Sequence, residues 1–255
     1  MVRPISIVLL LSVFLLPTGS EQVRADEKTP KEKNVLIIGA SSMDGLPELV
    51  GALLKANETP MKVERGHFGP SDLERIFASG KVWHYVIMDA WQLKRGSTES
   101  PEFPNAVAAF VKRVRAHSPE CNIILFPWWL PEAKATNEDV MKIFQHCVAA
   151  AKQNDIWVAT TGPAFMEARL ERRDLRITVS EQDAHPGIHG GYINACSLFS
   201  ILTGDSPVGL PATLTIPGRE KDVTIAPDDA RYLQELAWKV YQRELTHTKP
   251  AQPAM

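Results

Sequence analysis

Ser41 lies in a short turn between an apolar run and an amphipathic stretch. The run Val35–Ile38 ends at Gly39, and Ala40 and Ser41 follow it. A serine hydroxyl in such a turn can stand exposed above the edge of a sheet and act as a nucleophile. A helix cap and a phosphate-binding loop are the alternatives. The turn has neither Gly-x-Gly-x-x-Gly nor the Walker spacing, so the phosphate loop has little support.

A late polar loop is expected to carry the other groups that a nucleophilic serine needs. Asp183 and His185 lie two residues apart, directly before Pro186. The serine needs a base to accept its proton, and the base needs a carboxylate to orient it. If this segment folds back over the first strand, Ser41, His185 and Asp183 can form a catalytic triad. Taken alone, the pair can also be a surface loop with a solvated histidine.

Together, the two segments resemble the first and last sequence blocks of the SGNH (GDSL-like) hydrolases. Residues 187–196 and 202–204 also look like the continuation of the last block in many secreted members, so the resemblance covers most of residues 34–206. It implies a flavodoxin-like fold and hydrolysis of acyl esters, often on acylated carbohydrates. It also implies that Ser41 is the nucleophile, His185 the base and Asp183 the orienting acid.

The same resemblance implies hydrogen-bond donors for an oxyanion. The backbone N–H of Ser41 is one donor. The second block of the family supplies a glycine, for which Gly69 is the better match and Gly66 the second choice. The third block normally supplies an asparagine. Here Gln92 is the nearest amide, and an ionised Asp89 cannot donate.

Three features differ from the family pattern. Ala40 replaces the usual Asp or Asn, the Asp-to-His spacing is one residue shorter with Gln182 at the usual acid position, and the third block lacks its asparagine. Loss of one oxyanion donor typically costs about 10²–10³ in rate. Two hypotheses follow: an exported serine esterase that forms an acyl-enzyme, or a catalytically impaired SGNH-fold protein that binds carbohydrate.

Three tryptophans follow predicted strands and are candidate substrate contacts. Trp91 comes shortly after the third strand, and Trp128 and Trp129 come after the fourth. Indole rings can stack on sugar rings or line an acyl pocket. Packing in the core is the alternative for each of them.

A metal-dependent hydrolase built on Asp183, His185 and His189 is a third, weaker hypothesis. Two histidines four residues apart suit zinc on a helix. Pro186 and Gly187 lie within that spacing and argue against a continuous helix. We therefore predict no metal and no cofactor.

Short apolar runs alternate with amphipathic stretches along the chain. The apolar runs are 35–38, 61–64, 85–88, 122–126 and 156–160, and the amphipathic stretches are 46–55, 106–114, 138–151, 193–202 and 228–244. Apolar runs of this length are typical of strands buried on both faces of a parallel sheet. The alternation predicts an α/β fold, a three-layer α/β/α sandwich with a doubly wound, five-stranded parallel sheet. The functional residues then meet at the carboxyl ends of the strands.

The first 25 residues are typical of a secretory signal peptide. Arg3 precedes the apolar run Ile5–Leu16, which is shorter than the ~20 residues that a bilayer requires. We expect a signal peptide over 1–25, a polar linker over 26–33, one hydrolase-like domain over 34–245 and a flexible tail over 246–255. The mature protein is expected to be secreted or periplasmic, without a membrane span.

The net charge and the cysteine content exclude some classes of protein. The 255 residues carry 28 Lys and Arg against 30 Asp and Glu, a formal net charge of −2. A dedicated nucleic-acid binder usually has a basic excess, so the expected partner is a small-molecule or carbohydrate ester. Cys121, Cys147 and Cys196 are too few for a disulfide framework. Three buried thiols are expected in preference to one bridge and a spare thiol.

Overall fold

The computed structural model describes residues 32–93, 98–129, 136–216 and 220–248. The predicted signal peptide, the linker up to residue 31 and the tail from residue 249 lie outside the described residues. Five strands form the main sheet: β1 (Lys33–Ile38), β2 (Met61–Gly66), β3 (Tyr85–Asp89), β4 (Asn122–Phe126) and β5 (Trp157–Val158).

The main sheet is parallel, with the strand order β2-β1-β3-β4-β5. This is the flavodoxin-like order, in which the direction of strand addition reverses between β1 and β3; ligands in such folds bind in the crevice at the carboxyl ends of those two strands. The five predicted strands are all present. β5 is shorter than predicted, because only Trp157 and Val158 pair with β4.

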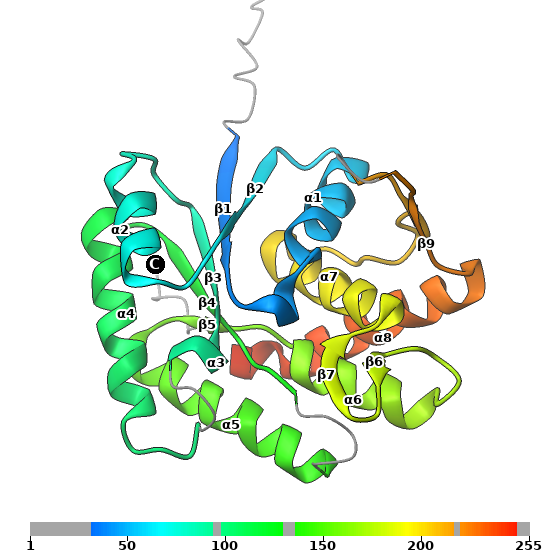
Figure 1. Cartoon of the computed structure of the whole chain (residues 1–255). Helices are drawn as coiled ribbons and strands as arrows, with labels where there is room; N and C mark the ends of the chain where they lie inside the picture. The colour runs from blue at the N-terminus through cyan, green and yellow to red at the C-terminus, as the bar shows by residue number, and fades with distance from the viewer. Residues whose placement is uncertain (1–31, 94–97, 130–135, 217–219, 249–255) are drawn as a thin grey trace, which may run out of the picture. The chain divides into compact units, whose positions relative to one another are not determined.

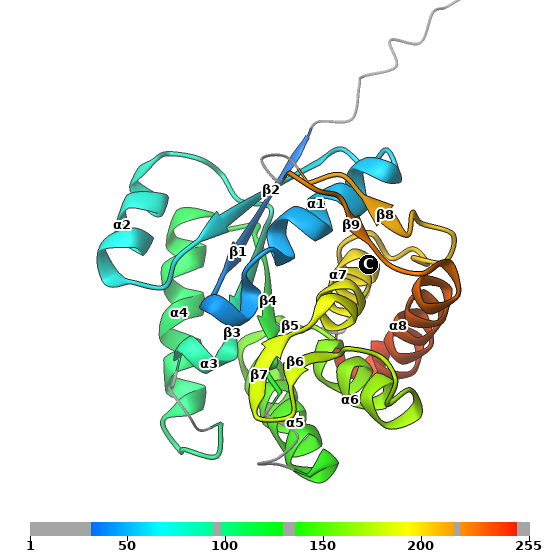
Figure 2. The same cartoon turned by 45° about the vertical axis from the view of Figure 1, so that its right-hand side comes forward.

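Helices cover both faces of the sheet (Figures 1 and 2). On one side lie α1 (Leu46–Ala56), α6 (Thr161–Glu171), α7 (Ile188–Thr203) and α8 (Pro227–Thr248), and on the other α2 (Pro70–Ala78), α4 (Phe103–His117) and α5 (Asn137–Asn154). Successive side chains of β1 alternate between the two cores. Val35 and Ile37 pack into the first, and Leu36 and Ile38 into the second. The predicted three-layer α/β/α sandwich is confirmed.

Helix boundaries follow local signals in the sequence. α5 begins with a capping box, in which Thr136 and Asp139 bond each other's backbone N–H groups. α7 ends at Thr203 and is capped by Gly204, whose φ of 83° lies in the left-handed region that favours glycine. α8 extends to Thr248, so residues 246–248 of the predicted tail belong to this helix.

Two small antiparallel sheets supplement the main one. β6 (Thr178–Ser180) pairs with β7 (Asp183–Pro186), and β8 (Thr213–Leu214) pairs with β9 (Val223–Thr224). Asp183 and His185 were expected in a polar loop and lie instead in a strand. β7 contacts the short 3₁₀ helix η1 (Ser41–Met43), which follows β1. The hairpin thereby brings the late segment to the end of the first strand.

The three cysteines are buried and free, as expected for thiols that act as small apolar side chains. Throughout the described ranges, no helix combines the length and apolar character needed to cross a bilayer.

Candidate functional site

Ser41 is the first residue of η1, directly beyond the carboxyl end of β1. The turn is tight because Met43 N–H donates to the Ala40 carbonyl and Asp44 N–H to the Ser41 carbonyl, both at 3.0 Å. Met43 is buried beneath the turn. A Cβ at Gly39 would overlap the Met43 side chain and lie 3.1 Å from the Asp89 Cβ. Glycine at position 39 therefore permits the turn that leaves Ser41 exposed.

The hydroxyl of Ser41 reaches a histidine 144 residues later in the chain. Ser41 Oγ lies 2.8 Å from His185 Nε2, and His185 Nδ1 lies 2.6 Å from Asp183 Oδ1. Both distances are those of direct hydrogen bonds. The side chains of His185 and Asp183 are 48% and 40% exposed, so the site is open to solvent. The structure thus brings together the three residues predicted to form a triad.

Strand geometry explains why the short Asp-to-His spacing works. In an extended strand, residues i and i+2 project from the same face. Asp183 and His185 have this relation in β7, and Asp183 Oδ1 also accepts the backbone N–H of His185 at 2.9 Å. The acid therefore needs neither a third intervening residue nor the Gln182 position.

The ionised form of Asp183 is favoured. The backbone N–H of His185, and then its imidazole, lower the pKa of this carboxyl. An ionised Asp183 makes His185 Nδ1 the hydrogen-bond donor of the ring. His185 Nε2 is then left without a proton and can accept the hydroxyl proton of Ser41.

Buried contacts hold the hairpin in place from behind. Trp129 Nε1–H donates to the carbonyl of Ala184, between the acid and the base, at 2.7 Å. The Trp129 ring stacks on Phe165 with 4.0 Å between centroids. A Cβ at Gly190 would overlap the Ile177 carbonyl, so glycine lets α7 pack closely against the segment that leads into β6.

His189 lies in the first turn of α7 and contributes to this anchoring. Its Nδ1 accepts the backbone N–H of Arg176 at 3.0 Å, and its Nε2 faces Asp229 at 3.7 Å. Partial burial lowers its pKa against the opposing effect of Asp229. No group of three His, Cys, Asp or Glu side chains in the described chain is placed to hold a metal ion.

The candidate oxyanion donors lie in three different elements. Ser41 is in η1, Gly69 directly precedes α2, and Gln92 is half-buried in α3 (Ala90–Leu93) after β3. Gly66, the second choice, ends β2 and packs against Leu36 and Ile38. The role of Ser41 N–H, Gly69 and Gln92 in an oxyanion hole stays a prediction.

The tryptophans are held mainly by the core. Trp128 and Trp129 are only 7% and 3% exposed. Trp91 is half-buried, and its ring meets that of Trp128 edge to face, with 5.2 Å between centroids. Neither Trp128 nor Trp129 offers an open ring face to a ligand in the free protein. Trp91 is the one of the three with substantial exposure.

A buried carboxylate lies behind the nucleophile turn. Asp89, the last residue of β3, is 1% exposed. Its Oδ1 accepts Trp91 N–H at 3.0 Å and its Oδ2 the hydroxyl of Ser42 at 3.4 Å, while the N–H of Ala40 also donates to this carboxylate. Burial raises the pKa of Asp89 to about 6, against the opposite effect of these three donors.

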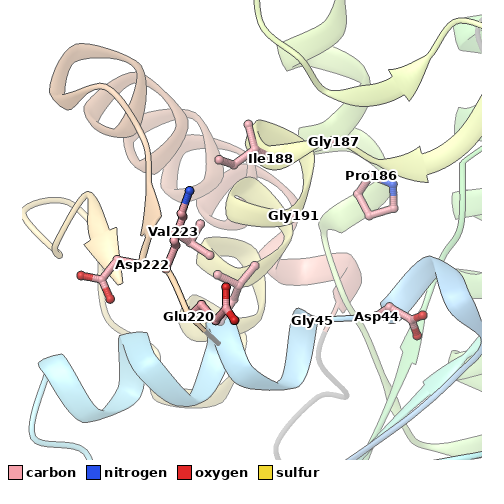
Figure 3. Close-up of a pocket in the computed structure, with 11 residues that line it drawn as sticks. Asp44, Gly45, Pro186, Gly187, Ile188, Gly191, Glu220, Asp222 and Val223 are labelled. Carbon is pink, nitrogen blue, oxygen red and sulfur yellow. The ribbon is translucent and has the colours of Figure 1, made fainter. Parts of the chain in front are cut away.

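A groove of about 710 Å³ opens beside the triad. Figure 3 shows Asp44 and Pro186 at one end, and Asp222 and Val223 at the other. Pro186 follows His185 in the chain, and Asp44 N–H bonds the Ser41 carbonyl. The first end is therefore lined by chain neighbours of Ser41 and His185, which do not themselves line the groove. Its lining mixes apolar, glycine and charged residues: Asp44, Gly45, Leu49, Pro186, Gly187, Ile188, Gly191, Glu220, Lys221, Asp222 and Val223.

Sequence reasoning missed the parts that support the site. It treated Asp89 only as a failed donor and Trp129 only as a ligand contact or core residue. The signal for Asp89 was its position at the end of a fully buried strand, next to the strand that carries the serine. A buried carboxylate there must find hydrogen-bond donors. For Trp129, no local pattern identifies the Ala184 carbonyl as its partner.

The comparisons with known proteins concern the fold. No family model and no curated protein matches the chain. A DUF4886 family protein from Bacteroides uniformis has 19% identity and a TM-score of 0.62, and the alignment covers 86% of this chain and 100% of that one. A catalytic mutant of Axe2, an acetylxylan esterase from Geobacillus stearothermophilus, has 17% identity, a TM-score of 0.52 and coverages of 69% and 96%.

A GDSL-like lipase from Parabacteroides merdae has 15% identity and a TM-score of 0.50 to this chain. The alignment covers 68% of this chain and 96% of the lipase. At these identities the likeness concerns the architecture. The chain shares its three-layer α/β/α fold with the acetylxylan esterase and the GDSL-like lipase.

Proposed function

We propose that this protein is a serine esterase that hydrolyses acyl esters through an acyl-enzyme. One observation carries the proposal: the continuous hydrogen-bonded path from Ser41 Oγ through His185 to Asp183, with distances of 2.8 and 2.6 Å. The three side chains come from segments far apart in the sequence and meet at an exposed edge of the sheet. This arrangement matches the nucleophile, base and orienting acid of acyl transfer.

Acylation begins with attack of Ser41 Oγ on the ester carbonyl carbon. His185 Nε2 takes the hydroxyl proton, and the carbonyl oxygen becomes an oxyanion. Ser41 N–H, Gly69 and Gln92 are the proposed donors to it. Collapse of the tetrahedral intermediate breaks the carbon–oxygen bond to the alcohol, and His185 delivers the proton to the leaving oxygen. Asp183 stabilises the imidazolium that exists between these transfers.

Deacylation repeats the steps with water as the nucleophile. His185 accepts a proton from water while the water oxygen attacks the acyl carbon. The second intermediate collapses, the proton passes to Ser41 Oγ, and the carboxylic acid leaves. The open position of His185 allows water to reach the acyl-enzyme without a change of fold.

The groove beside the triad is the proposed binding site for the part of the substrate away from the scissile bond. Its near end is lined by chain neighbours of the reacting residues, Asp44 and Pro186, and its volume of about 710 Å³ falls within the usual range for small-ligand sites. Carboxylates at Asp44 and Asp222 can accept hydrogen bonds from hydroxyl groups, and Leu49 and Ile188 supply apolar surface. A polyhydroxy alcohol such as an acetylated sugar suits this lining.

A panel of esters tests the proposed activity. Purified protein should release acid from acetyl esters, acetylated sugars included, and Ser41→Ala and His185→Ala should each reduce kcat by at least about 10³-fold. The Asp205→Asn variant, which changes an exposed loop residue, serves as the matched control and should keep full activity.

The carbohydrate-binding hypothesis predicts a different result in the same panel. Glycan binding that persists in Ser41→Ala, together with no turnover of any ester by folded wild-type protein, would select a binding protein over an esterase.

We further propose that the protein is exported, with residues 1–25 as its signal peptide. The pattern of Arg3, the apolar run Ile5–Leu16 and the small residues that follow supports this proposal. Expression of the full chain should give an extracytoplasmic product whose N-terminal sequence begins after Ser20 or Ala25. An intact N-terminus on cytoplasmic protein would contradict it.

A further inference from the structure

Asp89 belongs to the layer behind the nucleophile and takes no part in the proton transfers described above. It ends β3, beside β1, and is almost fully buried. A buried carboxylate loses its hydration, so it persists as an anion only where donors compensate it. Two of its three described donors, Ala40 N–H and the Ser42 hydroxyl, come from the residues on either side of Ser41.

We propose that Asp89 is a positioning residue that holds the nucleophile turn in its reactive geometry. This inference rests on the proposed esterase function and assigns a role to a residue that does not touch the substrate. The carboxylate accepts hydrogen bonds from Ala40 and Ser42, so it fixes the backbone from which the Ser41 hydroxyl projects. Trp91 N–H bonds the other oxygen at 3.0 Å and fixes the carboxylate itself.

The geometry favours a carboxylate over an amide at this position. Three donors converge on two oxygens, and a carboxylate accepts at both of them. An asparagine would present an NH₂ group to at least one of those donors. The Ser42 hydroxyl could accept a hydrogen bond from that NH₂ group, but a backbone N–H could not. Ala40 N–H and Trp91 N–H would then share one acceptor oxygen in place of two, although the shape of the side chain would hardly change. If Asp89 only filled space in the core, the protein would tolerate the replacement by asparagine.

The protonation of Asp89 predicts a specific pH dependence of Ser41 reactivity. Its pKa of about 6 lies within the range where esterases are assayed. The Cys147 thiol of α5 is a titratable group that interacts electrostatically with Asp89. Its pKa is raised, mainly by burial, so it stays neutral there. On acidification, Asp89 gains a proton and loses acceptor capacity towards the turn. Ser41 reactivity should therefore depend on two deprotonated groups, His185 and Asp89.

The experiment measures the second-order rate at which a fluorophosphonate labels Ser41 between pH 4.5 and 8.5. Labelling is a single chemical step at the Ser41 hydroxyl. Its rate therefore measures the reactivity of the nucleophile turn rather than substrate binding in the groove. In wild type, the rate should fall more steeply than one proton per pH unit on the acid side. In Asp89→Asn it should fall with a single-proton slope, from a value at pH 8 that is about 10- to 100-fold lower. Asp205→Asn should match wild type.

Three results separate the proposals. A single-proton slope in wild type, or Asp89→Asn labelling within twofold of wild type, would overturn the role of Asp89 and leave the esterase intact. No Ser41 adduct in folded wild-type protein would overturn the esterase, and the role of Asp89 with it. The wild-type pH profile decides the question even if Asp89→Asn fails to fold.

Discussion

Asp183 accepts two hydrogen bonds from a single residue, at the backbone N–H and at Nδ1 of His185. The first fixes the strand and the second fixes the imidazole ring. Because both lower the pKa of Asp183, the carboxylate remains ionised through the neutral range and well into acid. Asp183 itself should therefore not limit activity on the acid side of the pH profile.

Replacing Asp183 with Asn tests the orienting role at the scale of one atom pair. Asn lacks the charge and can offer an N–H to Nδ1, which places the imidazole proton on Nε2, opposite Ser41. We predict a loss of about 10³–10⁴-fold in kcat with little change in KM. Steady-state kinetics with a soluble ester provides the measurement.

Glu181 offers a matched control for that variant. It lies in the turn of the same hairpin and its side chain is exposed. Glu181→Gln should stay within twofold of wild type. A comparable loss in Glu181→Gln would show that charge in the hairpin, rather than contact with His185, sets the rate.

The elements of the main sheet follow directly from the sequence pattern, whereas the supports of the site do not. Continuous apolar runs such as Tyr85–Asp89 are fully buried on both faces and have no other stable setting. α6 went unpredicted because it packs against α5, α7 and α8 and lacks a single apolar stripe. Its first residues include Gly162 and Pro163, which also weaken the helical signal.

The triad was predicted from a local sequence pattern together with a family resemblance. The contacts that hold the triad in place are tertiary, so no local pattern predicts them. A glycine and a serine after the first strand, with an aspartate and a histidine two residues apart in a late segment, predicted Ser41, His185 and Asp183 although the Asp-to-His spacing is one residue shorter than in the family. The strand conformation of β7 was not predicted, because a strand of four residues paired with one of three leaves little periodicity in the sequence. The hydrogen bonds from Trp129 to Ala184 and from Ala40 to Asp89 join segments that only the folded chain brings together.

Trp129→Phe tests whether the core positions the hairpin. Phenylalanine keeps an aromatic ring against Phe165 but removes the N–H that bonds the Ala184 carbonyl. We expect a destabilisation of about 1 kcal/mol and a fall of about tenfold in kcat, because His185 loses its fixed backbone. Chemical denaturation and ester kinetics give the two quantities.

Trp83→Phe is the control for the loss of an indole N–H. Trp83 is equally buried, and its Nε1 has no hydrogen-bond partner among the described residues. Its replacement should leave kcat unchanged. Equal losses of kcat in both variants would mean that general core packing, rather than the bond to Ala184, controls the site.

Gly191→Leu tests the groove as the substrate site. Gly191 lies on the groove wall, and a Cβ there would approach Leu49 Cδ1 to 3.4 Å, a tolerable contact. A leucine side chain would fill part of the groove. KM for a bulky sugar ester should rise by about tenfold or more, while hydrolysis of a small acetyl ester should stay within threefold. Gly191→Ala should affect both substrates little, and equal effects of Gly191→Leu on both would contradict this role for the groove.

At the scale of the whole molecule, the buried Asp89 should lower stability as the pH rises. Its folded-state pKa of about 6 exceeds the ordinary aspartate pKa of 3.8, so between these pH values the carboxyl in the unfolded chain loses its proton first. The free energy of unfolding therefore falls as pH rises through this window, by up to about 3 kcal/mol. The contribution is present in full below pH 4 and lost above pH 6.

The comparison of wild type with Asp89→Asn isolates this effect from the other titrating groups. Urea denaturation at pH 4 and pH 7 should show the advantage of wild type over the variant shrinking by about 2–3 kcal/mol as pH rises. If the difference in unfolding free energy between wild type and Asp89→Asn stayed constant with pH, the pKa of Asp89 would not be raised in the folded protein.

The most direct test of the esterase is a covalent one. Residues 26–255 would be treated with a fluorophosphonate, and the adduct located by intact mass and peptide mapping. In the reaction, Ser41 Oγ bonds phosphorus, fluoride leaves, and His185 takes the hydroxyl proton. We predict a single adduct on Ser41 that is absent in Ser41→Ala and strongly slowed in His185→Ala. Well-folded protein that gains no adduct, or gains one that does not depend on His185, would contradict the proposed nucleophile and base.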